Sequence, residues 1–373
     1  MLFLNRELTW WAIGSLCFAI ASVSSAAGAG GGPILLSVLI LVLNLSLDVS
    51  SVISPVLITC SMFSVFLTNI KLKHPEDRLQ PCINWGLTLF ALPVMLIGST
   101  FGVILNQISP SWFINLVLIL FLVWGTYKTF FKGVKRYKAE TEQLKARIFV
   151  TNTIYGRPHI PAKLFLKLVS MWMVLIVVSI LKNVFPKCSS LWWLLQVLFW
   201  PIIALVYCYY GYLHLQEQVV ADLDMSPSKA FGILFTVFFL SALSALCGLG
   251  GGSALAVLFS AVFELHPRVM SATCATMVFF SASATTIQFA FLNAVEWDIA
   301  IPFMVVMTIS AFLGLKAVDY FVKKTHRSSI IVFIVVVMLL VSLVLLSYTG
   351  IKHTLSVYNE THELPLFNMD DLC

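Results

Sequence analysis

The sequence is poor in charged residues. Asp, Glu, Lys and Arg make up 11% of its 373 residues, whereas about 25% is usual for a soluble domain. Long apolar runs recur from Leu8 to Ser347, and the charges are confined almost wholly to the segments between them. This pattern excludes an ordinary soluble domain. It predicts an all-α polytopic membrane protein, because helices satisfy their own backbone hydrogen bonds inside a bilayer.

Motifs of catalytic and metal sites are also missing. The sequence has no HExxH, GxSxG or Walker A pattern, and its 8 cysteines form no CxxC pair. We therefore expect no enzyme activity, no catalytic residue, no bound metal and no cofactor. The cysteines are expected to serve as small packing residues. We also expect no nucleic-acid partner.

Two glycine clusters stand at equivalent places in the two halves of the chain. The stretch "GAGGGPILLSV" begins at Gly28, and "GLGGGSALAVL" begins 220 residues later at Gly248. Taken alone, the first cluster resembles the end of a signal peptide. A signal-peptide remnant would not be repeated 220 residues later in the chain. Farther on, "LIGSTFG" around Gly98 aligns with "FLGLKAV" around Gly314 after a four-residue gap. The sequence therefore predicts an internal repeat.

Each repeat contains five apolar segments, and two more lie between the repeats, so we expect about 10–12 membrane segments. The segments at 33–47 and 253–265 are too short for a comfortable span of about 20 residues. They are expected to be re-entrant or broken helices. We divide the chain into a first transmembrane repeat (1–131), a basic cytoplasmic linker (132–162), two connecting membrane helices (163–228), a second repeat (229–350) and a polar tail (351–373).

The charges of equivalent loops predict that the two repeats are inverted. "KLKHPEDR" in the first repeat is basic, whereas its counterpart "NAVEWD" is acidic. The next pair reverses this pattern, since "NQISPS" is uncharged and "KKTHRSS" is basic. Positive loops stay in the cytoplasm, so equivalent loops face opposite sides of the membrane. We expect a plasma-membrane protein with both termini outside, where the sequon at Asn359 would be accessible.

Inverted repeats with broken helices predict a substrate site near the bilayer midplane. Helices that begin at the glycine clusters direct their N-termini inward, which favours a small anion. The alternative, in which the glycines only permit close helix packing, stays open. Nearby hydroxyls offer neutral donors, although a single hydroxyl more often bonds to its own helix. The predicted substrate-binding residues are Gly30, Gly31, Gly32, Pro33, Gly250, Gly251, Gly252, Ser253, Ser61, Ser281 and Gln288.

Ionisable residues are rare in or beside the spans. We expect Lys316 and Asp319 to neutralise each other as an i, i+3 pair. Glu264, His266 and Arg268 are expected in a solvated cytoplasmic connection, with a proton-relay role for Glu264 or His266 as the alternative. The stretch "KGVKRYKAETEQLKAR" is interpreted as a solvated loop, with an amphipathic helix on the membrane surface as the alternative.

The paired motifs "GAGGGP" and "GLGGGS", each followed by a short apolar segment and a Ser/Thr-rich one, resemble the TauE/SafE sulfite exporter family. The resemblance covers both repeats. It implies a permease for small sulfur-containing anions such as sulfite or organosulfonates, without a cofactor. The sequence departs from symmetry where Pro33 stands opposite Ser253.

Several functional alternatives stay open on the sequence alone. A non-transporting membrane receptor or assembly protein would share the fold, and an anion channel would share the chemistry of the site. The expected partners are a small anion, the lipid bilayer and a coupling ion, either a proton or sodium. The direction of transport and the oligomeric state are not readable from the sequence.

Overall fold

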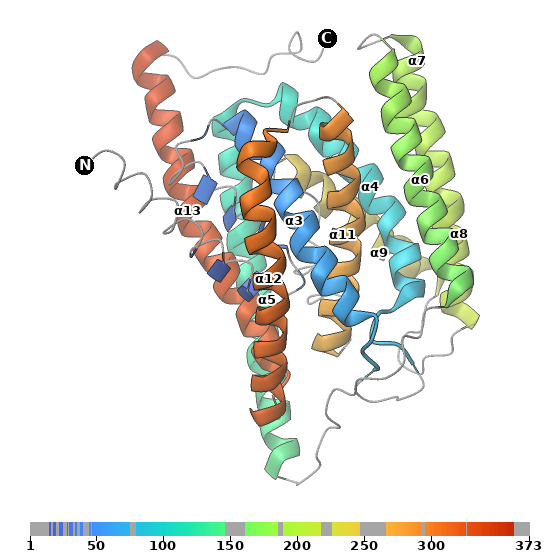
Figure 1. Ribbon diagram of the computed structural model, residues 1–373, viewed down its shortest axis with the longest axis vertical. Helices are drawn as coiled ribbons and strands as arrows, with labels where there is room; N and C mark the ends of the chain where they lie inside the picture. Colours follow the sequence, from blue (N-terminus) through green and yellow to red (C-terminus); the bar gives the residue numbers. More distant parts are fainter. Residues whose placement is uncertain are drawn as a thin grey trace.

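The structure is a computed structural model. It describes residues 47–74, 80–145, 161–185, 189–217, 226–246, 266–291, 295–325 and 327–361, together with single positions between 15 and 45. These parts of the chain are helical apart from short connections and one isolated bridge between Lys73 and Pro81. Eight of the described helices are long and apolar enough to cross a membrane, and most helices run along the long axis of the molecule (Figure 1). The predicted all-α polytopic membrane fold is confirmed.

The first repeat contributes three long helices to the described structure. They are α3 (Leu47–Asn69), α4 (Trp85–Ile108) and α5 (Ser111–Lys145). Asn84 caps α4, since its side chain accepts the backbone N–H of Leu87 at 2.9 Å. The basic residues 132–145, interpreted above as a loop, continue α5 as a helix.

The connecting segment forms a pair of helices at the side of the bundle (Figure 1). The first is α6 (Ala162–Val184), and the second consists of α7 (Ser190–Trp193), a π-helical stretch η1 (Leu194–Phe199) and α8 (Trp200–Glu217). The π-helical stretch ends two residues before Pro201. The ring of a proline clashes with the carbonyl four residues earlier, and proline has no N–H to donate. Proline therefore explains why the regular hydrogen-bond ladder is interrupted there.

The second repeat contributes four described helices. They are α9 (Pro227–Leu246), α11 (Pro267–Phe291), α12 (Trp297–Thr325) and α13 (Ser329–Thr361). Because α13 continues to Thr361, the first part of the expected polar tail, including Asn359, is helical.

Equivalent helices of the two repeats run in opposite directions. At one end of the molecule, the thiol of Cys82, just before α4, lies 3.8 Å from the carbonyl oxygen of Arg268, at the start of α11. The short connection from α3 to α4 lies at this same end, so α3 ends where its counterpart α11 begins. The opposite directions can be followed along the chain colours in Figure 1. The repeats are therefore inverted, as the loop charges predict.

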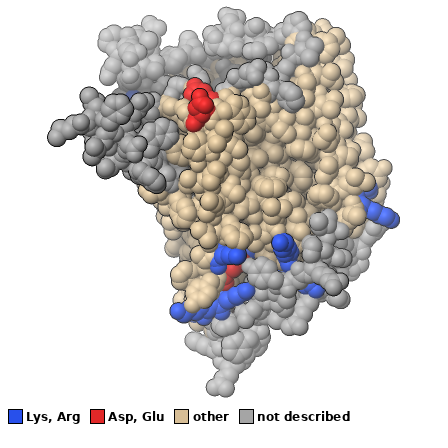
Figure 2. Space-filling view, viewed as in Figure 1, with Lys and Arg blue, Asp and Glu red and all other residues tan. Residues whose placement is uncertain are grey.

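The end of the molecule where α5 and α12 finish and α6 begins is called the basic end. Arg268 and Asp319 meet at this end, and the ring of Phe165 in the first turn of α6 lies 5.7 Å from that of Trp85 at the start of α4. Figure 2 shows most lysine and arginine side chains of the visible face near this end, at the bottom of the view. The charge asymmetry read from the loops is thus present in the folded protein.

The two repeats cross at α3 and α11. Here the hydroxyls of Thr59 and Thr286 are hydrogen-bonded at 2.9 Å, and the rings of Phe66 and Phe279 stack with centroids 5.2 Å apart. The 220-residue register places Thr59 opposite Phe279 and Phe66 opposite Thr286. Each contact is therefore the symmetry mate of the other, as a pseudo-twofold axis between the repeats requires.

Each repeat also packs its fourth segment against the first segment of the other. A side chain at Gly102 in α4 would collide with the carbonyl oxygen of Ala242 in α9, and one at Gly314 in α12 would collide with that of Ser22. Ser22 and Ala242 are themselves equivalent in the 220-residue register. The packing therefore pairs Gly314 with Gly102, one helical turn beyond the expected Gly98. A four-residue slip keeps the same helix face, which is why the sequence pattern does not distinguish the two.

Candidate functional site

The first glycine cluster forms a turn that is called the glycine turn, of which the structure describes Gly28, Gly30, Gly31 and Gly32. Gly28, Gly30 and Gly31 have φ angles of 70°, 74° and 69°, a left-handed region that favours glycine because it has no Cβ. Helical structure begins at Gly32, and the N–H of Leu35 donates to the carbonyl of Gly31 at 2.9 Å. The predicted break followed by a helix N-terminus is therefore present at this cluster.

The glycine turn is buried where the two repeats cross. A Cβ built on Gly30 would lie 3.0 Å from a methyl carbon of Ile58 in α3 and 3.1 Å from one of Val278 in α11. Ile58 and Val278 are equivalent positions of the two repeats. Gly28 lies directly against the backbone of Ser271. The turn thus belongs to the first repeat but packs on both.

The glycine turn provides backbone dipoles in place of charged side chains. Left-handed residues next to the start of a helix present several N–H groups to one concave region, and such arrangements bind anions. The side-chain atoms nearest to Gly30 belong to Ile58, Val278 and Met62, which are all uncharged. An anion held here would be bound by hydrogen bonds and by the partial positive charge of the helix N-terminus.

Two of the predicted site hydroxyls are in the described structure. Ser61 is fully buried, and its hydroxyl donates to the carbonyl of Ile58 at 3.0 Å. Ser281 is half-buried, and its carbonyl accepts the hydroxyl of Thr285 at 3.2 Å. Neither Ser61 nor Ser281 has a described hydrogen bond to the glycine turn. Pro33, Gly250, Gly251, Gly252, Ser253 and the side chain of Gln288 lie outside the described residues.

Many of the hydroxyls in α3 and α11 bond to a carbonyl of their own helix. These bonds join Thr59 to Pro55, Thr68 to Ser64, Thr273 to Val269, Thr276 to Ala272 and Ser283 to Phe280. The expectation that a single hydroxyl bonds to its own helix is confirmed for them. The backbone of the glycine turn is accordingly the stronger candidate for anion recognition.

Two polar side chains of α3 stand out because they are buried without a partner in the described structure. They are the hydroxyl of Ser50 and both amide atoms of Asn69. A buried polar group without a hydrogen bond costs about 1–3 kcal/mol, so such groups mark places where water, an ion or a substrate can bind. The sequence pattern does not single them out, because their unusual feature is burial rather than spacing.

A buried ion pair replaces one that the sequence suggests. The guanidinium of Arg268 in α11 donates to the carboxylate of Asp319 in α12 at 2.8 Å, and both residues are almost fully buried. The expected pairing of Asp319 with Lys316 is therefore wrong, since Lys316 is exposed and lies 4.1 Å from the ring of Phe312. Arg268 is also not solvated, because it is 3% exposed in the first turn of α11 and its guanidinium is paired with Asp319.

His266 lies beside this ion pair, just before α11, and is more enclosed than a solvated loop residue. Its Nδ1 accepts the backbone N–H of Arg268 at 3.2 Å. Burial, together with the positive charges of Arg136, His74 and Arg268, lowers the pKa of His266 to about 3. The imidazole is therefore neutral at physiological pH, and His266 serves as a hydrogen-bond acceptor at the basic end. Within the described residues, no group of three His, Cys, Asp or Glu side chains is placed to hold a metal ion.

The described fold is that of an integral membrane protein with two interlocked, inverted repeats and a glycine-broken helix where they cross. This architecture is typical of secondary transporters. The family model for the sulfite exporter TauE/SafE matches residues 148–343 of the chain. The protein belongs to this family of membrane transporters.

Relatives in Arabidopsis thaliana cover most of the chain. Sulfite exporter TauE/SafE family protein 1 is 28% identical over 90% of this chain and 82% of its own length. Sulfite exporter TauE/SafE family protein 2 is also 28% identical, over 93% of this chain and 84% of its own length. Sulfite exporter TauE/SafE family protein 3 is 27% identical over 98% of this chain. No solved structure matches the chain.

Proposed function

We propose that this protein is a secondary transporter that moves small sulfur-containing anions, such as sulfite or organosulfonates, by alternating access. The observation that carries the proposal is the glycine turn, buried at the crossing of α3 and α11 and lined near Gly30 by uncharged side chains. Sulfur oxyanions present several acceptor oxygens, which suit the backbone N–H donors of such a turn. The family membership and the names of the Arabidopsis relatives support this substrate class.

The inverted architecture supports the mechanism. Because the turn contacts equivalent positions of both repeats, a tilt of one repeat against the other exposes it first to one side of the membrane and then to the other. The basic end lies in the cytoplasm, since positive charge is retained there, and the end of α13 at Thr361 lies outside. The host is the plasma membrane, and a proton or sodium ion couples transport to a gradient.

Ligand-dependent stabilisation of the purified protein tests the substrate class. A ligand that binds the folded state raises its apparent stability according to concentration and affinity. We expect sulfite, thiosulfate, sulfoacetate or taurine to raise the Tm more than matched carboxylates do. The variant Gly31→Ala, which places a side chain at a left-handed position of the turn, should lose this shift while it keeps a cooperative transition. Equal shifts with sulfur anions and carboxylates would overturn the assigned substrate class.

A further inference from the structure

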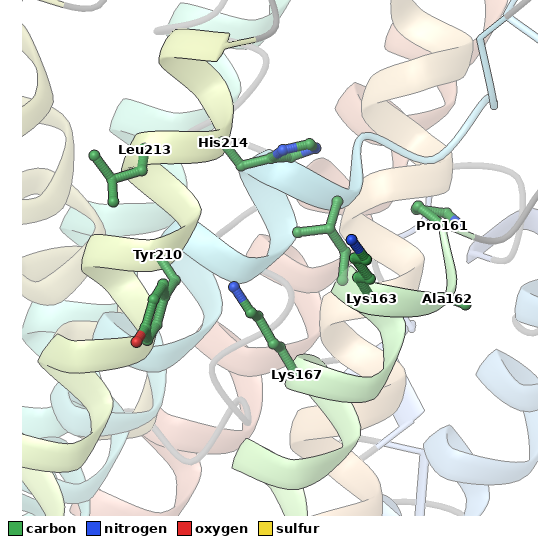
Figure 3. Close-up of a pocket in the computed structure, with 8 residues that line it drawn as sticks. Pro161, Ala162, Lys163, Lys167, Tyr210, Leu213 and His214 are labelled. Atoms are coloured by element: carbon green, nitrogen blue, oxygen red, sulfur yellow. The ribbon is translucent and has the colours of Figure 1, made fainter.

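A cavity of about 500 Å³ opens at the basic end between the first turns of α6 and the last turns of α8 (Figure 3). Lys163 and Lys167 line it from α6, and Tyr210 and His214 line it from α8. This cavity belongs to the connecting helices and not to the glycine turn. Nothing in the proposed transport cycle requires it.

Among the described side chains that line it, the cavity carries positive charge without a compensating carboxylate. Lys163 and Lys167 are one helical turn apart, a spacing at which like charges repel. The sequence from Gln143 to Gln216 contains no Asp or Glu, and among the described residues neither lysine has a carboxylate partner. The ammonium of Lys167 lies 4.0 Å from the ring centroid of Tyr210, a cation–π contact that holds the charge at the cavity. An anion between the two lysines would relieve their repulsion.

The start of α6 adds polar donors to the same wall. Pro161 precedes α6 without a side-chain cap, and its carbonyl accepts the N–H of Leu164 at 2.9 Å. Ala162 and Lys163 line the cavity, and their backbone N–H groups belong to the first turn, where no intrahelical acceptor exists. These donors and the two ammonium groups together suit a tetrahedral oxyanion such as a phosphate.

The surroundings of the cavity are those of a lipid site. Leu166 on α6 is 70% exposed and Tyr209 on α8 is 60% exposed, so apolar side chains of both helices continue outward from the cavity. Both helices are membrane-spanning, and the cavity lies near the end of each. Basic pockets between membrane helices at the cytoplasmic side bind the headgroups of anionic lipids. Lysine stems can lie along the apolar surface there while the ammonium groups reach the headgroup.

We infer that this cavity binds the phosphate of an anionic phospholipid, with the acyl chains along the exposed apolar face of α6 and α8. Lys163 and Lys167 contact the phosphate oxygens, and the first N–H groups of α6 complete the site. The lipid is a bound component of the connecting helices and is not transported.

Native mass spectrometry of the full chain released from nanodiscs tests this inference. The nanodiscs contain equal amounts of phosphatidylglycerol and phosphatidylcholine, and the measured quantity is the ratio of the two retained lipids. We expect the wild type to retain phosphatidylglycerol preferentially, and the variant K163Q/K167Q to lose about fivefold in this ratio for each lysine removed. The control K135Q/K138Q removes the same charge from exposed positions of α5 near the basic end and should leave the ratio unchanged.

Two further experiments distinguish a lipid site from a non-specific effect of positive charge and from a site for soluble anions. The variant K163R/K167R keeps both charges and should retain the preference, which also shows that the helices tolerate substitution here. Sulfite, inorganic phosphate and glycerol 3-phosphate at millimolar concentration should not displace the lipid. Equal retention of both lipids by the wild type, an unchanged ratio in K163Q/K167Q, or displacement by a free anion would each overturn the inference.

Discussion

Ile58 and Val278 meet at one glycine. Their methyl carbons lie 3.0 and 3.1 Å from the place that a Cβ on Gly30 would take, and the two residues occupy equivalent positions of the inverted repeats. A single position of the first repeat thus contacts its own third segment and the third segment of the other repeat at matching points. The break in the helix is therefore positioned by both repeats together.

Replacement of Gly30 by alanine should damage the protein at this point. The residue has a φ of 74°, where a side chain costs about 1–2 kcal/mol, and the new methyl group would crowd Ile58 and Val278. We expect a lower Tm and a loss of anion-dependent stabilisation in thermal unfolding. The control is Gly232→Ala in α9, where no atom of the described residues lies within 4 Å of the new Cβ. Alanine favours a helix by about 0.5–1 kcal/mol over glycine, so a Gly30→Ala protein as stable as this control would contradict the account.

Bulky residues at Gly102 and Gly314 should have similar effects, because both sites hold equivalent contacts between the repeats. Each side chain would run into backbone of the opposing first segment, and overpacking of this kind costs about 1–3 kcal/mol or more. Gly102→Leu and Gly314→Leu should each reduce the folded fraction seen by size-exclusion chromatography. Gly133→Ala is the matched mild change, since its nearest neighbours lie 3.4 Å from the new Cβ. A normal elution profile for Gly314→Leu would show that the first segment does not pack there.

The buried pair of Arg268 and Asp319 should be sensitive to the loss of one partner. Asp319→Asn leaves the guanidinium buried without its counter-charge, which typically costs about 3–5 kcal/mol. The double variant Arg268→Met/Asp319→Leu removes both charges and should recover much of the lost stability. The measurement is the midpoint of thermal unfolding in one detergent at one pH. If the double variant is less stable than Asp319→Asn, the pair does not act as a unit.

The stability of the protein should fall as the pH is lowered from about 6.5. The folded protein keeps His266 neutral because its pKa is lowered to about 3, whereas the unfolded chain binds a proton near the ordinary pKa of 6.5. The unfolded state therefore gains protons that the folded state does not, and the loss continues until the pH approaches 3. The variant His266→Gln should show a flatter profile than the wild type, with unfolding measured from pH 4 to 8. Parallel profiles for the two proteins would contradict the prediction.

The helices and their inversion could be predicted because both depend on local features of the sequence. The length of an apolar run sets whether a helix can span a bilayer, and loop charge sets its direction. The 220-residue register could also be read, since three consecutive glycines are rare enough in a helix to mark equivalent positions. The position in the first repeat that is equivalent to Gly314 could not be predicted exactly, because a shift of one helical turn leaves a residue on the same face of the helix.

The details of the site depend on contacts between distant segments. The sequence offers Asp319 a neighbouring lysine three residues away, but the folded helix turns Lys316 outward and brings Arg268 from α11. Similarly, Asn69 resembles the other polar residues of its segment until packing buries it without a partner among the described residues. Spacing along one helix shows which residues share a face, whereas only the tertiary packing decides what that face meets.

Sulfite counterflow in proteoliposomes tests the central claim most directly. Vesicles loaded with unlabelled sulfite are diluted into a trace of radiolabelled sulfite, and a carrier that alternates between two sides accumulates the label transiently above equilibrium. We predict this overshoot for the wild type and for Gly232→Ala, and its loss in Gly30→Ala. Passage of label without an overshoot would indicate a channel, and no passage of any sulfur anion through folded, reconstituted protein would contradict transport by this chain.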